Sequence, residues 1–531
     1  MRGQMLQRCL PFLFVALLAA CGTVPVAPWS PDLGDGRYQN PVIHADYSDP
    51  DVIRVGDMYY LTSSSFNSAP GLPLLQSPDM VNWTLVGHAL PQQVPLDVFA
   101  TPQHGKGVWA PCLRYHDGKF WIFYPDPDFG VYVMTATKFA GPWSAPRLLL
   151  AGKGIIDPAP LWDDDGKAYL LHAWAKSRAG INNLLTLRRM APDASSMLDD
   201  AGKTVIDANK LPGYTTLEGP KLYKHDGYYY VFAPAGGVEF GWQSVFRSRT
   251  IEGPYEARIV MAQGSSTVNG PHQGAWVRTP QGEDWFFHFQ DKRAYGRVVH
   301  LQPMQWRDGW PVIGEDVAGS GKGQPVARYR KPVTGHAATS PARSDEFDGP
   351  ALGLQWQWNA NWKPEWYSLT ARAGALRLYG QPSQQNLWDT PSLLLQKLPA
   401  ESFTVTAKLD VSQMGEGGKT GLVMYGSDYA WLGVRSDGGK NWLALVGCYK
   451  IEASCAEREE ASAELTSSQI CLRMQVRPGG VTTFSYSRDE QTYTVIGQPF
   501  TAKMGRWVGA QVGLFAVNGG HVDIDYFRVT P

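Results

Sequence analysis

Three carboxylic acids, an indole and an imidazole recur at one position of a repeated sequence pattern. In each repeat, a strand-like stretch is followed by a tight turn and a run of aromatic residues, which is typical of a β-hairpin. Four residues before the apolar residue that leads into each turn lie Asp49, Trp109, Asp157, Glu218 and His272. If the repeats are arranged around an axis, these five side chains converge on one spot.

The three acids match what the hydrolysis of a glycosidic bond needs. Two carboxyl groups must flank the scissile bond, one protonated to assist the leaving oxygen and one ionised to activate water or to attack directly. A third acid beside the proton donor would raise the donor's pKa by like-charge repulsion. A single Asp-Pro step is often only a turn, but three acids at one repeat offset are harder to explain that way. Asp49, Asp157 and Glu218 are therefore the candidate catalytic residues.

The elements that must position these residues are predicted to be the blades of a five-bladed β-propeller. The turns recur every roughly 50 to 60 residues, which suits one four-stranded blade with its loops. The innermost strand of each blade lines the central channel, so a site would form at its end. We expect the propeller over residues 38–317, with the aromatic runs in its core. The five turns begin at Gly56, Asp117, Asp165, Asp226 and Gly282.

A second domain is predicted after the propeller, so the fold class is all-β. Residues 318–342 are rich in Gly, Ala, Ser and Thr, which indicates a surface linker. Residues 343–531 show short alternating runs and almost no helical periodicity, which favours a concanavalin-like β-sandwich. In an oxidising compartment, Cys448 and Cys455 could close a small loop as a disulfide. Asp345 and Asp525 could hold a structural calcium ion, or could be solvated turn acids.

The N-terminus is predicted to be an export signal over residues 1–20. Its apolar run is too short to span a bilayer as a mature helix, and it ends in Leu18-Ala19-Ala20-Cys21, which resembles a bacterial lipobox. The resemblance implies lipidation of Cys21, with residues 21–37 as a tether. Gly22 favours sorting to the outer membrane, by similarity to Gram-negative lipoproteins. An ordinary secretory signal with an incidental cysteine is the alternative.

Composition and charge argue against several classes of partner. The chain has 531 residues and a formal net charge of -1, so no basic surface indicates nucleic-acid binding. Membrane contact is expected only through the lipid anchor. No Cys/His spacing indicates zinc, and we expect no cofactor to be required for catalysis. The 20 Trp and 24 Tyr suit contacts with sugar rings but equally suit β cores. The oligomeric state is left open.

Taken in chain order, the motifs resemble glycoside hydrolase family 43. They are Asn40-Pro41-Val42, Ser48-Asp49-Pro50-Asp51, Val108-Trp109-Ala110-Pro111, Ile156-Asp157-Pro158, Glu218-Gly219-Pro220 and Tyr295-Gly296-Arg297. The sandwich is similar to the C-terminal domain of many β-xylosidases of the family. The resemblance implies an exo-acting hydrolase that releases xylose, arabinofuranose or both from xylan or arabinoxylan oligosaccharides. A non-catalytic carbohydrate-binding propeller on the cell surface and an arabinan-directed hydrolase are the alternatives.

The resemblance also implies a role for each acid. Asp49 would be the general base that activates water, and Glu218 the general acid. Asp157 would tune the proton affinity of that acid and keep it oriented. The family inverts anomeric configuration, which requires carboxyl groups roughly 6.5 to 9.5 Å apart to admit water. Asp51 is a rival for Asp49, because alternate residues of an ideal strand face the same side. Asp49 is preferred because it shares the repeat offset.

Four further residues are candidate substrate-binding groups. Trp109 would form one wall against the sugar and Phe66 another, although either could be plain core. Arg297 could bind sugar hydroxyls through its fork of donors, or form an ion pair at the rim. His272 could orient the site through water or help to bind a cation, or could be a satisfied core histidine. The metal content of the site is left unassigned.

Overall fold

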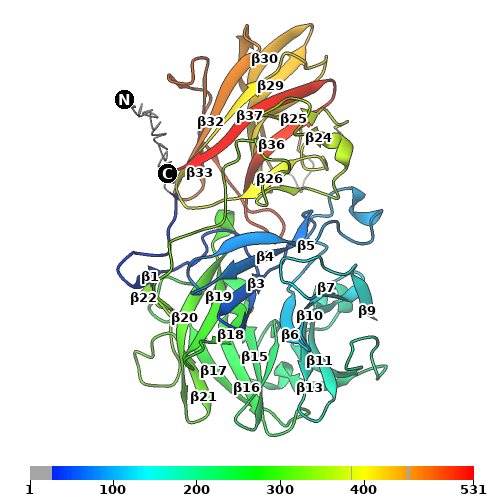
Figure 1. Ribbon diagram of the computed structural model, residues 1–531, viewed down its shortest axis with the longest axis vertical. Helices are drawn as coiled ribbons and strands as arrows, with labels where there is room; N and C mark the ends of the chain where they lie inside the picture. The colour runs from blue at the N-terminus through cyan, green and yellow to red at the C-terminus, as the bar shows by residue number, and fades with distance from the viewer. Residues whose placement is uncertain (1–26, 384, 451–454) are drawn as a thin grey trace, which may run out of the picture.

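The computed structural model describes residues 27–383, 385–450 and 455–531 and consists of two β lobes, one above the other in Figure 1. The predicted signal peptide and Cys21 lie outside the described residues. Within the described part, no helix is long and apolar enough to cross a membrane. The helices are single turns: α1 (Lys176–Ala179), α2 (Gly237–Phe240), η1 (Val98–Ala100), η2 (Ala208–Lys210), η3 (Arg293–Tyr295) and η4 (Pro364–Trp366).

Five four-stranded antiparallel sheets form the lower lobe and confirm the predicted five-bladed propeller. Each sheet takes four consecutive strands, and β2 contacts both β6 and β18, so the ring closes between the first and last blades. The blades are β2 (Asp51–Val55), β3 (Met58–Thr62), β4 (Gly71–Ser77) and β5 (Thr84–Leu90); β6 (Cys112–His116), β7 (Lys119–Asp126), β8 (Gly130–Ala136) and β9 (Arg147–Ala151); β10 (Ile155–Trp162), β11 (Ala168–Trp174), β12 (Leu184–Met190) and β13 (Lys203–Asp207); β14 (Lys221–His225), β15 (Tyr228–Ala235), β16 (Trp242–Ser248) and β17 (Glu256–Ala262); β18 (His272–Arg278), β19 (Asp284–Asp291), β20 (Arg297–Arg307) and β21 (Trp310–Ile313).

The aromatic runs fill the spaces between blades, as expected for a propeller core. Successive residues of a strand face opposite sides, so the second strand of a blade serves both of its neighbours. In the fourth blade, Tyr230 and Phe232 pack with Phe286 of the fifth, while Val231 and Ala233 pack in a cluster with the third. Each fully buried side chain of this size contributes about 1.5–3 kcal/mol through burial alone. The repeated hairpins therefore form the frame that fixes the inner strand ends.

The upper lobe is a sandwich of a seven-stranded and an eight-stranded antiparallel sheet. A large apolar cluster, which includes Leu394, Val405, Leu422 and Leu472, lies between the sheets. The seven-stranded sheet contains β23 (Gln357–Trp358), β26 (Leu394–Lys397), β28 (Lys419–Tyr425), β29 (Tyr429–Asp437), β30 (Lys440–Cys448), β31 (Arg458–Leu465) and β36 (Gln511–Val517). The other contains β24 (Tyr367–Ser368), β25 (Leu376–Tyr379), β27 (Phe403–Asp410), β32 (Gln469–Arg477), β33 (Val481–Ser487), β34 (Thr494–Val495), β35 (Phe500–Thr501) and β37 (His521–Thr530).

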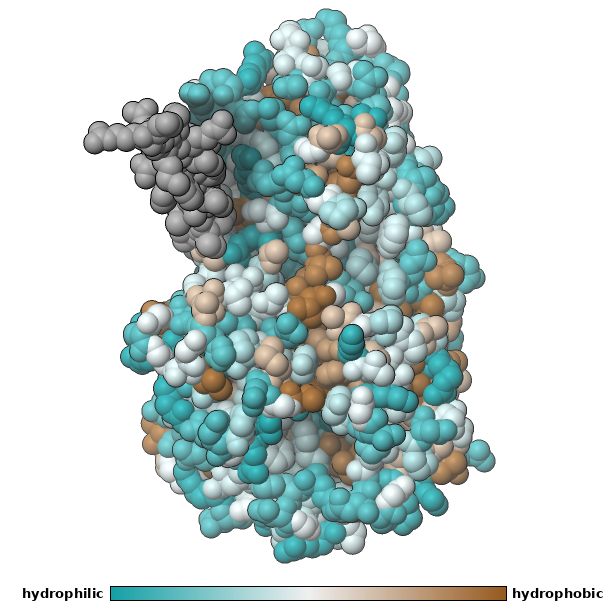
Figure 2. Space-filling view, in the orientation of Figure 1, coloured by the Kyte–Doolittle hydropathy of each residue, from teal (hydrophilic) through white to brown (hydrophobic). Residues whose placement is uncertain are grey.

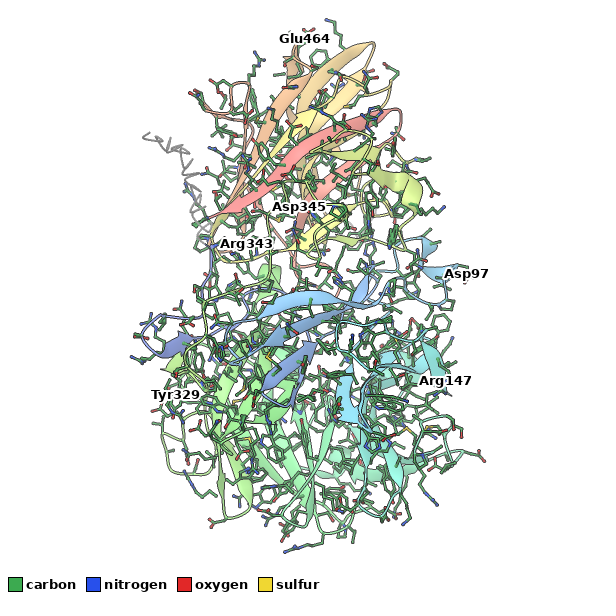
Figure 3. The ribbon with its side chains drawn as sticks, viewed as in Figure 1. Asp97, Arg147, Tyr329, Arg343, Asp345 and Glu464 are labelled. Carbon is green, nitrogen blue, oxygen red and sulfur yellow. A yellow bond between two sulfur atoms is a disulfide. The ribbon has the colours of Figure 1, made fainter. Side chains whose placement is uncertain are left out.

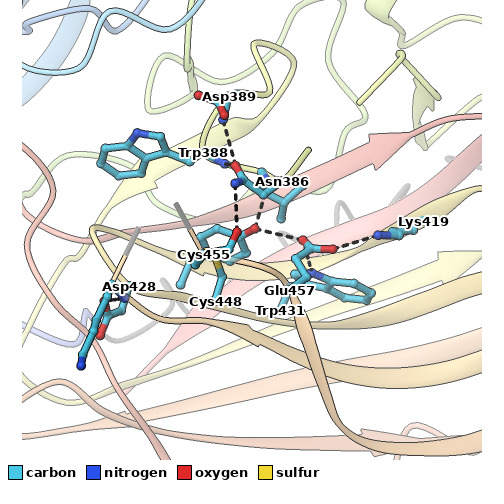
Figure 4. Close-up of a disulfide and its surroundings, with 12 residues drawn as sticks. Asn386, Trp388, Asp389, Lys419, Asp428, Trp431, Cys448, Cys455 and Glu457 are labelled. Atoms are coloured by element: carbon cyan, nitrogen blue, oxygen red, sulfur yellow. Dashed lines mark hydrogen bonds and ion pairs between the residues drawn. A yellow bond between two sulfur atoms is a disulfide. The ribbon is translucent and has the colours of Figure 1, made fainter. Parts of the chain in front are cut away.

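The predicted disulfide is present at the end of β30. Cys448 and Cys455 are bonded, and Glu457 beside them forms an ion pair with Lys419 (Figure 4). The two acids considered for calcium both have protein partners. Asp345 accepts hydrogen bonds from nearby backbone N–H groups and from an indole, and Asp525 forms ion pairs with basic side chains. A calcium ion at these acids stays a prediction.

The segment expected as a linker is attached to the propeller. Within it, β22 (Arg328–Arg330) pairs with β1 (Arg37–Gln39), and the buried Lys331 forms ion pairs with Asp32 and Asp79. The chain then enters the sandwich at Arg343 and Asp345, which lie at the boundary between the lobes (Figure 3). Apolar side chains gather along the same boundary on the face shown in Figure 2.

The sandwich covers the propeller face at which the inner strands begin. Ala69 of the first blade and Trp358 of the sandwich exchange backbone hydrogen bonds. At the fifth blade, the N–H of Ala510 donates to the carbonyl oxygen of Ala294 at 2.7 Å. Because contacts are made at both places, the sandwich has a fixed orientation over the mouth of the propeller.

Candidate active site

A pocket that encloses about 480 Å³ of empty space, part of it open to solvent, lies where the inner strands of the propeller meet the sandwich. It brings together six of the seven residues predicted for the site. His272 is the exception, because it is fully buried behind the wall. The lining residues are Asp49, Phe66, Trp109, Ala110, Ile156, Asp157, Glu218, Val238, Gln273, Arg297 and Trp507.

Irregular backbone turns the acids into this pocket. Asp49 and Asp157 have φ values of 54° and 55°, in the left-handed region that non-glycine residues rarely adopt. The register of β10 shifts between Ile156 and Ala159, so Asp157 sits in a bulge rather than in the regular ladder. Such local strain persists only where the surrounding structure enforces it, and it is typical of functional sites.

Asp49 is held in one orientation by a ring of donors. Its Oδ2 accepts hydrogen bonds from the hydroxyls of Ser64 at 2.5 Å and Ser48 at 2.9 Å. Nη1 of Arg297 lies 3.2 Å from Oδ1, which forms a buried ion pair. These contacts leave the carboxylate at the pocket wall with positive charge beside it.

Asp51, the rival candidate, is a structural residue. Its side chain is fully buried, and its Oδ2 accepts hydrogen bonds from the N–H of Leu113 at 2.7 Å and from Arg114 at 3.0 Å. Lys221 lies 3.8 Å from the same oxygen. The expectation that Asp51 faces the same side as Asp49 fails because the left-handed residue at Asp49 breaks the alternation of the strand.

Asp157 and Glu218 are neighbouring acids that interact electrostatically. Burial raises the pKa of Asp157, and the negative charge of Glu218 raises it further. The N–H of Gly219 donates to Oδ2 of Asp157 at 2.7 Å, which favours the ionised form and opposes the shift.

His272 supports Glu218 instead of lining the pocket. Its Nε2 lies 2.9 Å from Oε1 of Glu218. The register of β18 shifts between His272 and Gly274, and the residue that reaches the pocket wall from this blade is Gln273, with a φ of 38°. His272 was one of the candidate substrate-binding groups, with a core position as an alternative, and the bulge explains why its neighbour Gln273 lines the pocket instead.

Aromatic side chains supply the other walls, as the sequence predicted. The rings of Phe66 and Trp109 meet edge to face with centroids 6.5 Å apart. The Nε1 of Trp109 donates to the carbonyl oxygen of Gly105 at 3.0 Å, which fixes the plane of the indole. Flat apolar faces held in this way can pack against a sugar ring.

Trp507 of the sandwich is a wall residue that the sequence did not predict. The ring centroids of Trp507 and Trp109 lie 6.3 Å apart. The guanidinium carbon of Arg297 lies 5.8 Å from the centroid of the Trp507 ring. Its side chain stays 43 % exposed, so one face is open to the pocket mouth. The propeller repeats contain no signal for it. The sequence offers one hint, a large aromatic residue between two nearby glycines, Gly505 and Gly509.

The described residues show no group of three His, Cys, Asp or Glu side chains placed to hold a metal ion. The pocket offers acid–base chemistry by carboxyl groups, in a cavity with aromatic walls and one guanidinium. Two carboxyl groups on opposite sides of a bound glycoside are the equipment that its hydrolysis requires.

Comparison with known proteins agrees with this geometry. The sequence model of "Glycosyl hydrolases family 43" matches residues 38–311, and that of "Beta xylosidase C-terminal Concanavalin A-like domain" matches residues 344–530. A protein of Xylanibacter ruminicola is 37% identical over 493 residues, covering 91% of this chain and 86% of its own. A β-xylosidase of Formosa agariphila is 33% identical, covering 98% of this chain and 97% of its own.

A solved structure supports the same assignment for the whole architecture. The xylan β-1,4-xylosidase of Bacillus halodurans superposes with a TM-score of 0.82 at 26% identity, covering 93% of this chain and 100% of that one. A non-catalytic binding propeller is therefore not favoured, and the concanavalin-like nature of the upper lobe is confirmed. The chain belongs to glycoside hydrolase family 43 and is an enzyme that hydrolyses glycosidic bonds.

Proposed function

We propose that the protein is an exo-acting, inverting hydrolase that removes xylose or arabinofuranose from the ends of xylan or arabinoxylan oligosaccharides. The observation that carries this proposal is the pocket itself, in which three acids of the propeller face Trp507 of the sandwich. A cavity closed on its far side by a second domain accommodates a chain end, whereas an endo-acting arabinanase needs an open groove. Inside the pocket, Arg297 can bind hydroxyl groups while the aromatic walls take the ring faces.

The proposed reaction is a single displacement by water. Glu218 donates a proton to the leaving oxygen as the glycosidic bond breaks, and Asp49 accepts a proton from the attacking water. Asp157 acts on Glu218 by like-charge repulsion, and His272 fixes the orientation of Glu218. The hydrogen bonds to Asp49 from Ser48 and Ser64 aim its carboxylate at the water. No cofactor takes part in this scheme.

The names of the relatives support both xylose and arabinofuranose as the released sugar. Besides the β-xylosidases, a non-reducing end α-L-arabinofuranosidase of Bacteroides ovatus is 28% identical, covering 93% of this chain and 95% of its own. Xylopyranose and arabinofuranose present similar hydroxyl arrangements, so one pocket can accept both.

Hydrolysis of nitrophenyl β-D-xyloside and nitrophenyl α-L-arabinofuranoside by the purified protein tests this proposal. The protein would begin after Cys21 to avoid the lipid. Release of nitrophenol from either glycoside supports the function, and the ratio of the two kcat/KM values identifies the preferred sugar. The absence of hydrolysis of both compounds and of xylan oligosaccharides would refute it.

Replacing Asp157 with asparagine is expected to stabilise the fold more at alkaline than at acid pH. The pKa of Asp157 is raised above its usual 3.8 in the folded state, so the folded protein holds a proton that the unfolded chain releases as pH rises. This carboxyl group therefore lowers stability progressively above about pH 4, until the pH passes the folded-state pKa. Asparagine does not titrate and escapes the loss.

Thermal melting of wild type and Asp157→Asn at about pH 5 and about pH 8 checks this sign. The gain in Tm should be larger at the higher pH, while kcat falls. The exposed Asp165→Asn is the control, because the pKa of Asp165 is lowered by its contacts with Lys167. An equal Tm difference at both pH values would contradict the assignment.

We further propose that the protein is exported and anchored in the outer membrane through a lipid on Cys21. The lipobox-like sequence before Cys21 supports this proposal. Expression with the native leader should place the protein in the membrane fraction, and Cys21→Ser should release it or block its processing. An unchanged distribution of the variant would argue for an ordinary secretory signal.

A further inference from the structure

Asp46 lies three residues before Asp49 and connects the two lobes behind the pocket. Its side chain is buried in the propeller, and it does not line the pocket. One oxygen, Oδ1, accepts a hydrogen bond from the N–H of Arg297 at 2.9 Å. The other, Oδ2, accepts one from the N–H of Gly509 in the sandwich at 2.8 Å. A single carboxylate therefore joins backbone groups of two domains.

Both of these backbone groups belong to segments that form the pocket. Arg297 carries the guanidinium that pairs with Asp49, at the start of β20. Gly509 lies two residues after Trp507, the wall that the sandwich contributes. Asp46 therefore helps to place two parts of the pocket at once. One is the Arg297 guanidinium beside Asp49, and the other is the Trp507 wall.

The backbone at Gly509 and Gly296 is closely packed around Asp46. A Cβ at Gly509 would lie 2.6 Å from the backbone nitrogen of Gly296, and a Cβ at Gly296 would lie 2.4 Å from Cγ of Asp46. Contacts this short cannot be made by real Cβ atoms, so both positions need glycine. The loop that ends at Gly509 is thus packed directly against the backbone next to Arg297.

The charge of Asp46 is balanced by groups from both lobes. Burial raises its pKa, and the positive charge of Lys397, at the end of β26 in the sandwich, is the strongest opposing influence. The hydrogen bonds from Arg297 and Gly509 also oppose the shift. A buried carboxylate without such partners would be costly, so its environment is complete only when the sandwich is docked.

We propose that Asp46 is a positioning residue that locks the Trp507 loop onto the catalytic propeller and so sets the far wall of the sugar pocket. The kinetic part of this inference rests on the proposed function, whereas the structural part does not. Asparagine at position 46 keeps the shape but offers one oxygen, so one of the two N–H groups would meet an amide N–H instead of an acceptor.

Hydrogen exchange of the full-length protein tests the lock without any substrate. In Asp46→Asn, the amides of residues 505–509 should exchange about tenfold faster or more, as expected for the loss of one buried hydrogen bond. Asn361→Ala is the matched control, because Asn361 joins the lobes at another place, through the backbone of Gln93 just after the first blade. The control should leave exchange of residues 505–509 unchanged. Equal exchange in wild type and Asp46→Asn would overturn the proposal, whether or not the enzyme acts on pentosides.

Kinetics then separate positioning from general stability. Asp46→Asn should raise KM about tenfold with a smaller change in kcat, and this KM effect should largely disappear when Trp507 is already alanine. Gly509→Ala, which disturbs the same contact from the sandwich side, should reproduce the KM effect if Asp46→Asn folds poorly. Additive effects of Asp46→Asn and Trp507→Ala on KM would overturn the coupling.

Discussion

Glu218→Gln is expected to lower kcat on xylobiose by about 10²–10⁴-fold, the usual contribution of a positioned general acid. The loss should be much smaller on a dinitrophenyl xyloside. A dinitrophenolate departs without protonation, whereas the sugar oxygen of xylobiose does not. Steady-state kinetics of both substrates with wild type and variant give the two ratios.

The control for Glu218→Gln is Glu239→Gln. Glu239 lies on α2 beside the pocket residue Val238, but it is exposed and does not line the pocket. Its replacement should leave both substrates unaffected. Equal losses on the two substrates for Glu218→Gln would mean that Glu218 does not donate the proton to the leaving group.

Asp49→Asn is expected to lower kcat by at least about 10²–10⁴-fold on both kinds of substrate, because a good leaving group cannot replace the base that activates water. Its melting temperature should fall less than that of Asp51→Asn, although the buried Arg297 loses its charged partner. The amide can still accept hydrogen bonds from Ser48 and Ser64, and Arg297 lines the open pocket. Kinetics and thermal melting of one preparation provide both quantities.

Asp51→Asn should show the reverse pattern. Removing this fully buried carboxylate leaves Arg114 and Lys221 without their partner, which costs about 3–5 kcal/mol for a buried pair. The expected result is a large drop in Tm with residual activity in the folded fraction. If Asp51→Asn were instead stable and inactive while Asp49→Asn retained activity, the two assignments would have to be exchanged.

The sequence was sufficient to predict the site residues that occupy equivalent positions of the repeats. Asp49, Trp109, Asp157 and Glu218 share one offset from the apolar residue that precedes each turn, and a closed ring of equivalent blades brings equivalent positions to one centre. The aromatic runs were correctly expected in the core, because alternating residues of each second strand serve two neighbouring blades.

The remaining features depend on contacts that no local pattern encodes. Trp507 and Gly509 come from another domain, and their approach is decided by the docking of two lobes. The placement of Gln273 instead of His272 at the wall results from a bulge that shifts the register of β18. Asp46 has backbone N–H groups as its partners, which leave no signature in side-chain types.

The most direct test of the account is the configuration of the sugar as it is first released. Proton NMR can follow wild-type enzyme on whichever pentoside it hydrolyses faster, before mutarotation equilibrates the anomers. Displacement by a water that Asp49 activates predicts a first product with the opposite anomeric configuration to the substrate, such as α-xylose from a β-xyloside. A first product that retains the configuration of the substrate would mean that a carboxylate attacks the sugar directly, and it would contradict the roles assigned to Asp49 and Glu218.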